Sequence, residues 1–267
     1  MGKVILIRGC GDVGSAVACA LFKAGHPVVI HDSAQPAATR RKMSFSDAMF
    51  EGTAVLEGVR GQRMDELLQI KSSLEARDRI PLTTLELLRV LSALQPHVLV
   101  DARMRKHDQP ETQINLAPFT IGLGPNFVAG ITVHAAIETG WNEDLGKVIW
   151  KGATRPLEGE PQTIAGHARD RYVYAPVAGI FRTELQIGAV VHAGQDVAGI
   201  GESKLCAPIS GVLRGLTHDS VPVKERTKVI EVDPRGAEAQ ITGIAKRPGK
   251  IAAGVLEAIE NSGRAHQ

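Results

Sequence analysis

The sequence is poor in cysteine, in aromatic residues and in excess charge of either sign. Its three cysteines, Cys10, Cys19 and Cys206, have neither the paired spacing of a disulfide framework nor the spacing of a metal site. Aromatic residues make up 4% of the chain and the net charge is +2, which leaves little to stack on bases. We therefore expect no disulfide-stapled domain, no metal site and no nucleic-acid partner.

The sequence also has no long apolar run. No stretch approaches the ~20 apolar residues that a membrane-spanning helix needs. The first apolar run begins directly after Met1-Gly2-Lys3 and has no small-residue cleavage site. We expect a cytoplasmic protein with no membrane partner.

The most informative segment is an apolar run followed by a glycine-rich turn. After Val4–Ile7 comes Arg8-Gly9-Cys10-Gly11-Asp12-Val13-Gly14, a G-x-G-x-x-G pattern that leads into an Ala-rich amphipathic stretch. A buried strand, a glycine turn and a helix aim backbone N–H groups and a helix N-terminus at a phosphate. Gly9 would make the turn, Gly11 would admit a pyrophosphate, and Gly14 would let helix and strand pack closely. A glycine turn without any ligand stays open as the alternative.

An acidic residue follows the next predicted strand, Pro27–His31. There the carboxylate of Asp32 can bond both hydroxyls of an adenosine ribose and repel a 2′-phosphate, which favours NAD-like ligands. Arg40 and Arg41 blur this preference, because a guanidinium after the second strand can neutralise a phosphate. NAD-like and NADP-like ligands both remain open.

Strands and helices then alternate along the chain. Strands are predicted at 53–56, 59–64, 80–82, 97–102 and 119–123, and helices at 65–77 and 84–93. This alternation predicts an α/β fold, a Rossmann-like doubly wound sheet with helices on both faces. Ligands of such sheets lie beyond the carboxyl ends of the strands. At that edge we place Asp32, Asp101 and the loop Gly122-Leu123-Gly124-Pro125-Asn126.

The second half of the chain contains an internal repeat. Ala175-Pro176-Val177-Ala178-Gly179-Ile180-Phe181-Arg182 returns as Ala207-Pro208-Ile209-Ser210-Gly211-Val212-Leu213-Arg214. Two similar halves of short strands imply a small all-β domain, and the pattern resembles the barrel-sandwich hybrid of biotinyl and lipoyl carrier domains. Lys204, in the hairpin between the halves, lacks the flanking Met of a biotin site. We therefore expect no biotin or lipoyl group.

These patterns divide the chain into four parts. We expect a Rossmann-like nucleotide- or cofactor-binding domain at 1–151, a linker or functional loop at 152–170, and the barrel-sandwich domain at 171–240. A C-terminal helix at 241–267 should pack back on a core, because 249–259 has one apolar helical face.

Cys10 is the candidate for covalent chemistry. Helix-dipole N–H groups at the glycine loop would stabilise a thiolate or a persulfide there. The alternative is a small residue that fills a permissive turn. His134 and Glu138 are four positions apart, but the surrounding β-branched residues indicate a strand and argue against a helical metal site.

Several motifs, spread in order over nearly the whole chain, resemble one family, the YqeB-type accessory proteins of selenium-dependent molybdenum hydroxylases. They are Arg8-Gly9-Cys10-Gly11-Asp12, Gln35-Pro36 with Arg40-Arg41, Ser44-Phe45-Ser46-Asp47-Ala48, Glu51-Gly52, Ile121-Gly122-Leu123-Gly124-Pro125-Asn126-Phe127-Val128-Ala129-Gly130, Ala175-Pro176 with Gly179, Asp233-Pro234-Arg235-Gly236 and Gly254-Val255-Leu256-Glu257-Ala258-Ile259. The resemblance implies molybdenum hydroxylase maturation, with a nucleotide-binding half similar to XdhC-type proteins. It also implies handling of the molybdenum cofactor or another pterin nucleotide, and a hydroxylase or its maturation proteins as partners. Two departures stand out: Cys10 replaces a usual Gly, and Asp32 replaces a Glu-rich stretch.

The favoured hypothesis is an accessory protein that binds a small anionic, phosphate-bearing cofactor at the glycine loop. An NAD(P)-dependent oxidoreductase is the alternative, although no hydride-site constellation is visible, and a structural scaffold is a third. The candidate cofactor-binding residues are Arg8, Gly9, Cys10, Gly11, Asp12, Gly14, Asp32, Arg40, Arg41, Asp101, Gly122, Gly124 and Asn126.

Overall fold

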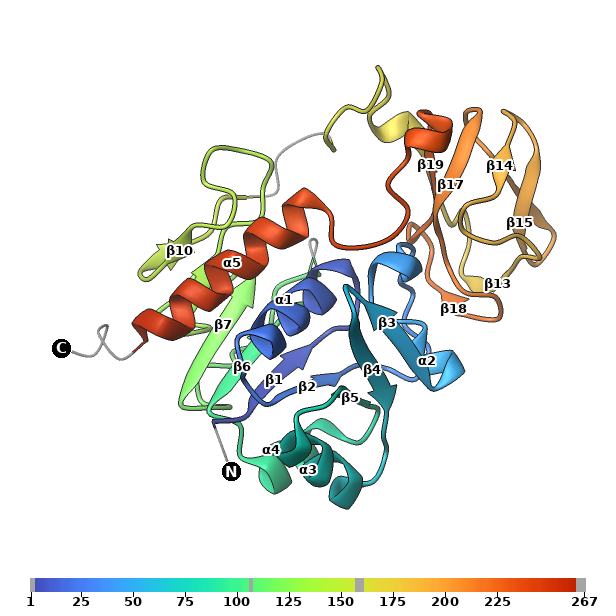
Figure 1. Ribbon diagram of the computed structural model, residues 1–267. Coiled ribbons are helices and arrows are strands. Elements are labelled where there is room, and N and C mark those ends of the chain that lie inside the picture. Colours follow the sequence, from blue (N-terminus) through green and yellow to red (C-terminus); the bar gives the residue numbers. More distant parts are fainter. Residues whose placement is uncertain (1–2, 106–107, 157–160, 263–267) are drawn as a thin grey trace.

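The larger part of the molecule is a nine-stranded sheet. A computed structural model describes residues 3–105, 108–156 and 161–262, and its sheet has the order β10-β9-β7-β6-β1-β2-β5-β4-β3 (Figure 1). The strands are β1 (Ile5–Arg8), β2 (Val28–His31), β3 (Thr53–Leu56), β4 (Val59–Arg63), β5 (Ile80–Thr83), β6 (Val98–Asp101), β7 (Phe119–Leu123), β9 (Ala135–Ile137) and β10 (Val148–Ile149). The seven strands from β4 to β9 in this order are parallel, whereas β3 and β10 at the two edges are antiparallel to their neighbours.

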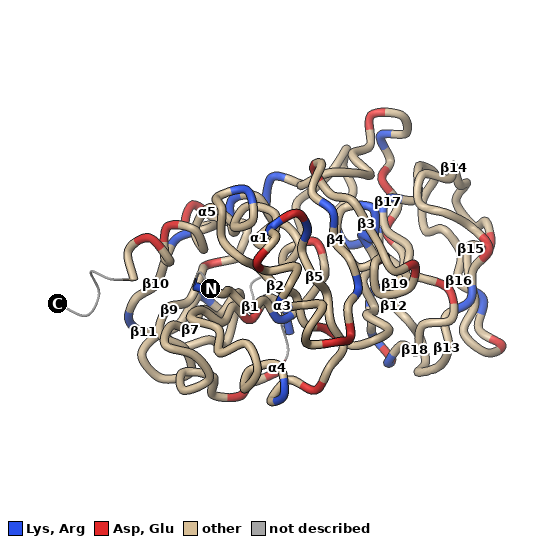
Figure 2. The backbone as a smooth tube through the Cα atoms, turned by 60° about the horizontal axis from the view of Figure 1, so that its bottom comes forward, with Lys and Arg blue, Asp and Glu red and all other residues tan. Residues whose placement is uncertain are grey.

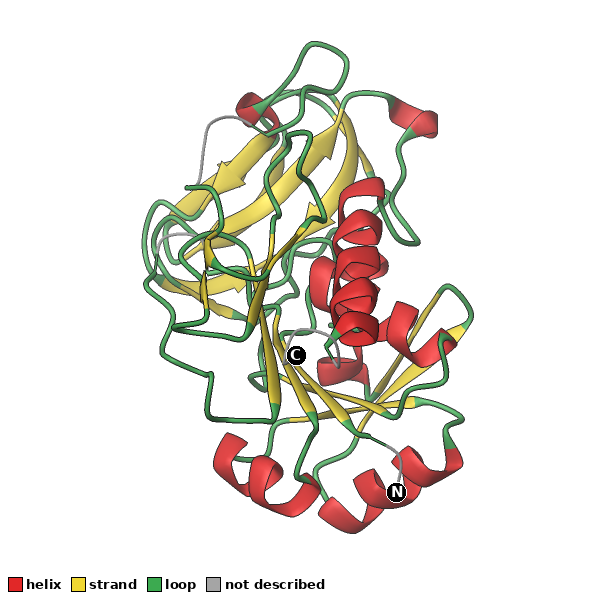
Figure 3. Ribbon diagram, turned by 90° about the vertical axis from the view of Figure 1, so that its left-hand side faces the viewer, coloured by secondary structure: helices red, strands yellow, loops and turns green. Residues whose placement is uncertain are grey.

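Helices cover both faces of this sheet (Figure 3). On one face α1 (Asp12–Lys23) and α5 (Lys246–Asn261) share a core with Ile5 and Ile7, and on the other face α3 (Leu67–Ala76) and α4 (Leu87–Leu94) share a core with Leu6. Alternate residues of β1 thus face opposite cores, as the pleat of a strand requires. A single turn of helix, α2 (Ala48–Glu51), precedes β3.

The predicted fold class, a Rossmann-like doubly wound sheet followed by a barrel-sandwich hybrid, is wrong for this chain. The sheet is large and mixed, and only four helices in the described residues have eight residues or more. The connections from β6 to β7 and from β7 to β9 hold no helix in their described residues. Beyond residue 102 the alternation of strands and helices ends, and α5, from the far end of the chain, covers the face that crossover helices would cover.

A smaller all-β unit follows. Its two antiparallel sheets have the orders β12-β19-β17-β14 and β16-β15-β13-β18, and they enclose a separate apolar core. The strands are β12 (Tyr172–Tyr174), β13 (Gly179–Arg182), β14 (Val190–Val191), β15 (Asp196–Ile200), β16 (Ser203–Cys206), β17 (Gly211–Leu216), β18 (Pro222–Val223) and β19 (Lys228–Asp233). The repeat is visible in the pairing, since β13 pairs with β15 and β18 while β17 pairs with β19 and β14.

Lys204 lies inside β16 rather than at the tip of its hairpin. It pairs with Gly199, the turn is formed by Gly201 and Glu202, and its Nζ donates to Asp196 Oδ2 at 2.8 Å. Carrier domains present their modified lysine at a turn. Lys204 lies within a strand, so this hairpin differs from that of a carrier domain.

Two segments connect the units. The first contains β11 (Gly152–Ala153), which pairs with β8 (Val128–Ala129), and a short 3₁₀ turn at Arg169–Arg171. The second leaves β19 through a 3₁₀ turn at Gly236–Glu238 and becomes α5. Among the helices described, none has the length and apolar character needed to cross a membrane.

Candidate functional site

The carboxyl ends of the central strands line up at one edge of the sheet. Arg8 of β1 is in register with His31 of β2 and Asp101 of β6, and Asp101 is in register with Gly122 of β7. The glycine loop, Gly9 to Gly11, continues from this row. The Cys10 N–H donates to Asp32 Oδ2 at 2.7 Å, so the structure brings the loop and Asp32 together.

The three glycines of the G-x-G-x-x-G motif differ in whether the fold requires them. Gly9 has φ +110°, and a Cβ on it would lie 3.0 Å from the backbone of Ala102. A Cβ on Gly14 would lie 2.0 Å from the Gly9 carbonyl oxygen. Gly11 has φ −66°, and a Cβ there would meet nothing within 4 Å. The fold thus requires Gly9 and Gly14, whereas Gly11 leaves open space at the N-terminus of α1.

This open space adjoins a helix N-terminus with free donors. No described residue accepts a hydrogen bond from the N–H of Gly11. The first N–H groups of a helix lack partners within the helix and carry a partial positive charge. An anion that approached over Gly11 would meet these donors.

Asp12, the first residue of α1, places a carboxylate at the same point. Its Oδ1 accepts from the Val13 N–H at 3.0 Å, and its Oδ2 accepts from Arg40 Nη1 at 3.0 Å. Burial acts to raise the pKa of Asp12, but the charges of Arg40, Lys228 and Arg247 outweigh burial and lower it. The Asp12 charge is therefore balanced by the basic groups around it.

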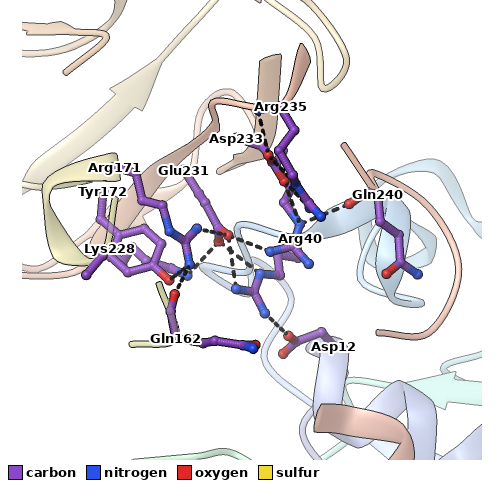
Figure 4. Close-up of polar contacts among 12 residues, drawn as sticks. Asp12, Arg40, Gln162, Arg171, Tyr172, Lys228, Glu231, Asp233, Arg235 and Gln240 are labelled. Carbon is purple, nitrogen blue, oxygen red and sulfur yellow. Dashed lines mark hydrogen bonds and ion pairs between the residues drawn. The ribbon is translucent and has the colours of Figure 1, made fainter. Parts of the chain in front are cut away.

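Arg40 joins α1 to a buried carboxylate in the all-β unit (Figure 4). Glu231 of β19 is fully buried and accepts hydrogen bonds from four cations, which together with it form what we term the Glu231 cluster. Its members are Arg40 (Nε–Oε2 2.9 Å, Nη2–Oε1 3.0 Å), Arg171 (Nη1–Oε1 2.7 Å), Arg214 (Nη1–Oε1 2.9 Å) and Lys228 (Nζ–Oε2 3.1 Å). Although burial favours the neutral acid, these cations hold the pKa of Glu231 well below its usual range.

The junction between the two units carries excess positive charge. The four cations of the Glu231 cluster share the carboxylates of Glu231 and Asp12, and Arg214 Nε also lies 4.0 Å from Asp233 Oδ2, although Asp233 forms a closer two-pronged pair with Arg235. Arg247 of α5 adds a further cation, with its Nε donating to the Thr139 carbonyl at 2.8 Å. Figure 2 shows basic residues along this junction, beside β3 and β17. The arrangement suits an anionic ligand.

Other predicted site residues have partners within the protein. Arg8 Nη1 donates to Glu111 at 2.8 Å and to Gln113 at 2.9 Å, and its buried Nε has no partner among the described residues. Asp101 is buried and accepts from Gln113 and from Arg103. The structure thus places Arg8 and Asp101 in an internal network below the loop.

Arg41 has a structural position rather than a ligand-facing one. Its Nε donates to the Leu216 carbonyl in β17 at 2.9 Å, and its Nη1 donates to Asp47 at 2.7 Å. The side chain is buried. Arg41 therefore connects the all-β unit to the segment around Asp47 by hydrogen bonds. The sequence had suggested a role in binding a phosphate instead.

The second glycine loop, residues 122–126, lies at the same sheet edge. Side-chain packing and backbone conformation explain its residue types. A Cβ on Gly122 would lie 2.2 Å from the Phe127 ring. Gly124 and Asn126 have positive φ values of +105° and +73°. Asn126 Nδ2 also donates to the Asp108 carbonyl at 3.1 Å. These contacts account for the residue types without a ligand.

Cys10 is in an unfavourable position for thiolate chemistry. Its side chain is fully buried. Burial, and then the neighbouring Asp32 carboxylate, raise the pKa of the Cys10 thiol well above its usual value. A neutral thiol is a poor nucleophile, so the geometry favours the structural alternative for Cys10.

No metal centre is evident in the described parts of the chain, where no group of three His, Cys, Asp or Glu side chains converges. His134 Nδ1 accepts from the Thr120 N–H at 3.1 Å, while the Glu138 carboxylate accepts from the N–H groups of Thr139, Gly140 and Arg155. His134 and Glu138 therefore serve different contacts.

The sequence patterns did not identify five charged residues of this junction. They are Arg171, Arg214, Lys228, Glu231 and Arg247. The one available signal is the segment Lys228-Val229-Ile230-Glu231-Val232-Asp233, which places charged residues inside a short apolar strand. A cavity of about 780 Å³, with His97, Asn115 and His134 among its lining residues, has no residue of the Glu231 cluster in its lining.

Comparisons with known proteins give one sequence relative. The chain is 36% identical over 257 residues to "Uncharacterized protein YqeB" of Escherichia coli (strain K12). The match covers 96% of this chain and 47% of the relative, so the chain spans about half the length of the curated relative it matches. No family model matches the chain.

Similarity to solved structures is low. A succinylglutamate desuccinylase/aspartoacylase from Rhodobacter sphaeroides is 15% identical with a TM-score of 0.23 over 54% of this chain and 61% of that one. The ectoine utilization protein EutE (DoeB) from Ruegeria pomeroyi is 12% identical with a TM-score of 0.25 over 87% and 85%. Similarities this low carry no inference about this chain. The sequence match, in contrast, supports the YqeB-type family for this chain.

Proposed function

We propose that this protein binds a small phosphate-bearing cofactor at the glycine loop. The observation that carries the proposal is Gly11, which the fold does not require and which leaves open space over the N-terminus of α1. A glycine in an ordinary backbone conformation is useful where a ligand must approach the backbone closely. Gly11 is in that position.

The electrostatics of the junction support an anionic ligand. Arg40 pairs with both Asp12 and Glu231, and Lys228 shares the single Glu231 carboxylate with three arginines, so cations outnumber carboxylates here. Charge-assisted hydrogen bonds to phosphate are about twice as strong as neutral ones. A phosphate is therefore the group best suited to this place.

We further propose an accessory role in molybdenum hydroxylase maturation, with the molybdenum cofactor or another pterin nucleotide as cargo. This part of the proposal rests on the YqeB-type resemblance. It agrees with a binding site that offers donors and positive charge but only a buried, neutral thiol for covalent chemistry. The partners would be a hydroxylase or its maturation proteins.

An NAD(P)-dependent oxidoreductase is the second candidate. The observation that favours it is Asp32, which lies beside the loop at the end of β2, where a ribose-binding acid is expected. Both of its oxygens already accept backbone hydrogen bonds, Oδ2 from Cys10 and Oδ1 from Ser33 at 2.7 Å each. Each oxygen retains a lone pair for a ribose hydroxyl.

Mass spectrometry of ligands released from the purified protein tests both candidates. A pterin phosphate supports the accessory role, and a nicotinamide dinucleotide supports the oxidoreductase. Gly11→Val should release the ligand while thermal unfolding shows a folded protein. Gly199→Val is the matched control, because Gly199 of β15 also has an ordinary φ and only one distant neighbour, at 3.5 Å. Equal ligand retention by both variants would contradict binding at the glycine loop.

A further inference from the structure

We infer that three arginines form a binding site for a phosphate monoester, and that the carboxylate of a glutamate fills this site in the structure. The arginines are Arg8, Arg103 and Arg105, which we term the arginine triad, and the glutamate is Glu111. The inference goes beyond the proposed function, because it uses side chains at the ends of β1 and β6 and no backbone donor of the glycine loop.

The arginine triad converges on one carboxylate. Arg8 Nη1 donates to Glu111 Oε1 at 2.8 Å, and Arg103 Nη2 donates to the same oxygen at 2.5 Å. Arg105 Nη2 donates to Glu111 Oε2 at 2.5 Å. The three guanidinium groups are therefore close enough together for one oxyanion to contact all of them.

The triad lies where the strand order of the sheet reverses. Arg8 ends β1 and is in register with Asp101, which ends β6, and Arg103 and Arg105 follow directly after β6. Strands β2 and β5 lie on one side of β1, whereas β6 and β7 lie on the other. In open α/β sheets such a reversal leaves a crevice at the carboxyl ends of the strands, and ligands bind there. The triad is thus at a place where a ligand is expected.

Glu111 is a counter-ion that a ligand can replace. Its side chain is 45% exposed, whereas Asp101 is buried. Asp101 accepts hydrogen bonds from Arg103 and Gln113, which fix it below the triad. Rotation of the exposed Glu111 side chain would free the position that all three guanidinium groups contact, and Asp101 would stay in place.

Arg8 has a donor that the described protein groups leave unsatisfied. Its side chain is 9% exposed, and its buried Nε has no hydrogen-bond partner among the described residues. An orphaned buried donor is commonly explained by an ion or a water that the chain itself does not supply. Burial, and then the charge of Arg103, lower the pKa of Arg8, so more negative charge beside this guanidinium would stabilise its charged form.

The charges favour a phosphate over a carboxylate. The triad carries three positive charges, and its partners Asp101 and Glu111 carry two negative charges, which leaves one positive charge in excess. A phosphate monoester carries up to two negative charges, so in place of Glu111 it would balance the triad. It also offers three terminal oxygens for three guanidinium groups, whereas Glu111 has two, and Arg8 and Arg103 share one of them.

Calorimetric titration of the full chain with inorganic phosphate tests the inference. Glu111→Gln removes the competing carboxylate, so we expect phosphate to bind at least about tenfold more tightly than to the wild type, the effect of one hydrogen bond to a charged group. Adding Arg105→Gln to this variant should abolish the gain. Acetate, a monoanion with two oxygens, should bind to Glu111→Gln at least about tenfold more weakly than phosphate.

Glu143→Gln is the matched control, because Glu143 is an exposed glutamate that accepts from one arginine, Arg155, at 3.0 Å. It should leave the phosphate affinity unchanged. A folded Glu111→Gln variant with wild-type affinity, or a gain that survives Arg105→Gln, overturns the site, and acetate binding as tight as phosphate binding overturns the ligand class. Adding Gly11→Val to Glu111→Gln should retain the gain, so failure of this site and failure of the glycine loop are separate results.

The wild-type protein provides a second measurement that needs no variant. Phenylglyoxal modifies accessible arginines, and the side chains of Arg105 and Arg155 are 29% and 46% exposed. Saturating inorganic phosphate should slow the modification of Arg105, followed by peptide mass spectrometry, and leave that of Arg155 unchanged. Equal rates at Arg105 with and without phosphate would overturn the inference.

Discussion

Arg40 and Glu231 form a two-pronged ion pair between residues 191 positions apart in the sequence, with Nε–Oε2 and Nη2–Oε1 distances of 2.9 and 3.0 Å. The third arm of the same guanidinium holds Asp12 at the start of α1. One side chain therefore links the glycine-loop helix to the core of the all-β unit. A buried carboxylate among cations also makes the junction sensitive to loss of a single charge.

Glu231→Gln should destabilise the protein by about 3–5 kcal/mol, because it leaves the surrounding cations buried without their anion. Urea unfolding followed by circular dichroism measures this loss. Glu202→Gln, in the exposed turn between β15 and β16, is the control and should change the free energy of unfolding by less than about 0.5 kcal/mol. A loss for Glu231→Gln as small as that of the control would show that the cluster adds no stability.

The contribution of Glu231 should disappear in acid. Its pKa in the folded protein lies well below the ordinary value of 4.5, so the stabilisation is fully present above pH 4.5 and is lost as the pH falls toward the folded pKa. The difference in unfolding free energy between wild type and Glu231→Gln should shrink by about 1.4 kcal/mol for each pH unit below 4.5. Urea titrations from pH 7 to pH 3 test this, and a difference that stays constant would contradict it.

Two glycines of one motif should differ in how much stability they lose on replacement by alanine. Gly14→Ala places a Cβ 2.0 Å from the Gly9 carbonyl oxygen, so we expect a loss of about 1–3 kcal/mol or more, as in overpacked cores. Gly11→Ala meets open space with an ordinary φ and should change stability by less than about 0.5 kcal/mol. Thermal unfolding of the two variants decides the matter. Equal losses would mean that Gly11 also serves the fold.

Thiol reactivity should separate Cys206 from the other cysteines. Cys10 and Cys19 are buried and Cys206 is exposed. With a disulfide reagent at pH 8, we expect one fast-reacting thiol in the native protein and three after unfolding. In Cys206→Ser the fast phase should vanish. A fast phase that persists in this variant and is lost in Cys10→Ser would reinstate Cys10 as a reactive residue.

Many of the helices and strands in the first hundred residues could be predicted from local sequence patterns. The helix expected at 65–77 is α3 (Leu67–Ala76), and the strands expected at 53–56 and 59–64 are β3 and β4. The next helix begins later than expected, at Leu87, because Glu86 itself caps it by accepting from the N–H groups of Leu88 and Arg89. Which side chain caps a helix depends on geometry that the sequence pattern does not contain.

The overall fold class could not be predicted in the same way. Local periodicity indicates a helix only where it occurs in the sequence, whereas the face beside β9 and β10 is covered by α5, which begins at Lys246. The sequence patterns therefore suggested that strands and helices alternate regularly. In the structure this alternation ends after β6.

The candidate site was predicted in part. The motif predicted the glycine loop and placed Asp32 beside it, since both follow from strand ends in one sheet. The role of Arg40 depends on Glu231, and that pairing is a tertiary contact without a local signal. Arg41, its sequence neighbour, faces β17 instead, because adjacent residues point in different directions.

The pairing of α1 with α5 has a consequence for synthesis of the chain. Helix α1 begins at residue 12 and its covering partner ends at residue 261, so the apolar surface they share stays uncovered until α5 has been synthesised. A nascent chain in this state exposes α1 and the edge strands for as long as the remaining residues take to emerge, which invites association with other chains. We therefore expect the docking of α5 to be the step that commits the whole larger unit to its native state.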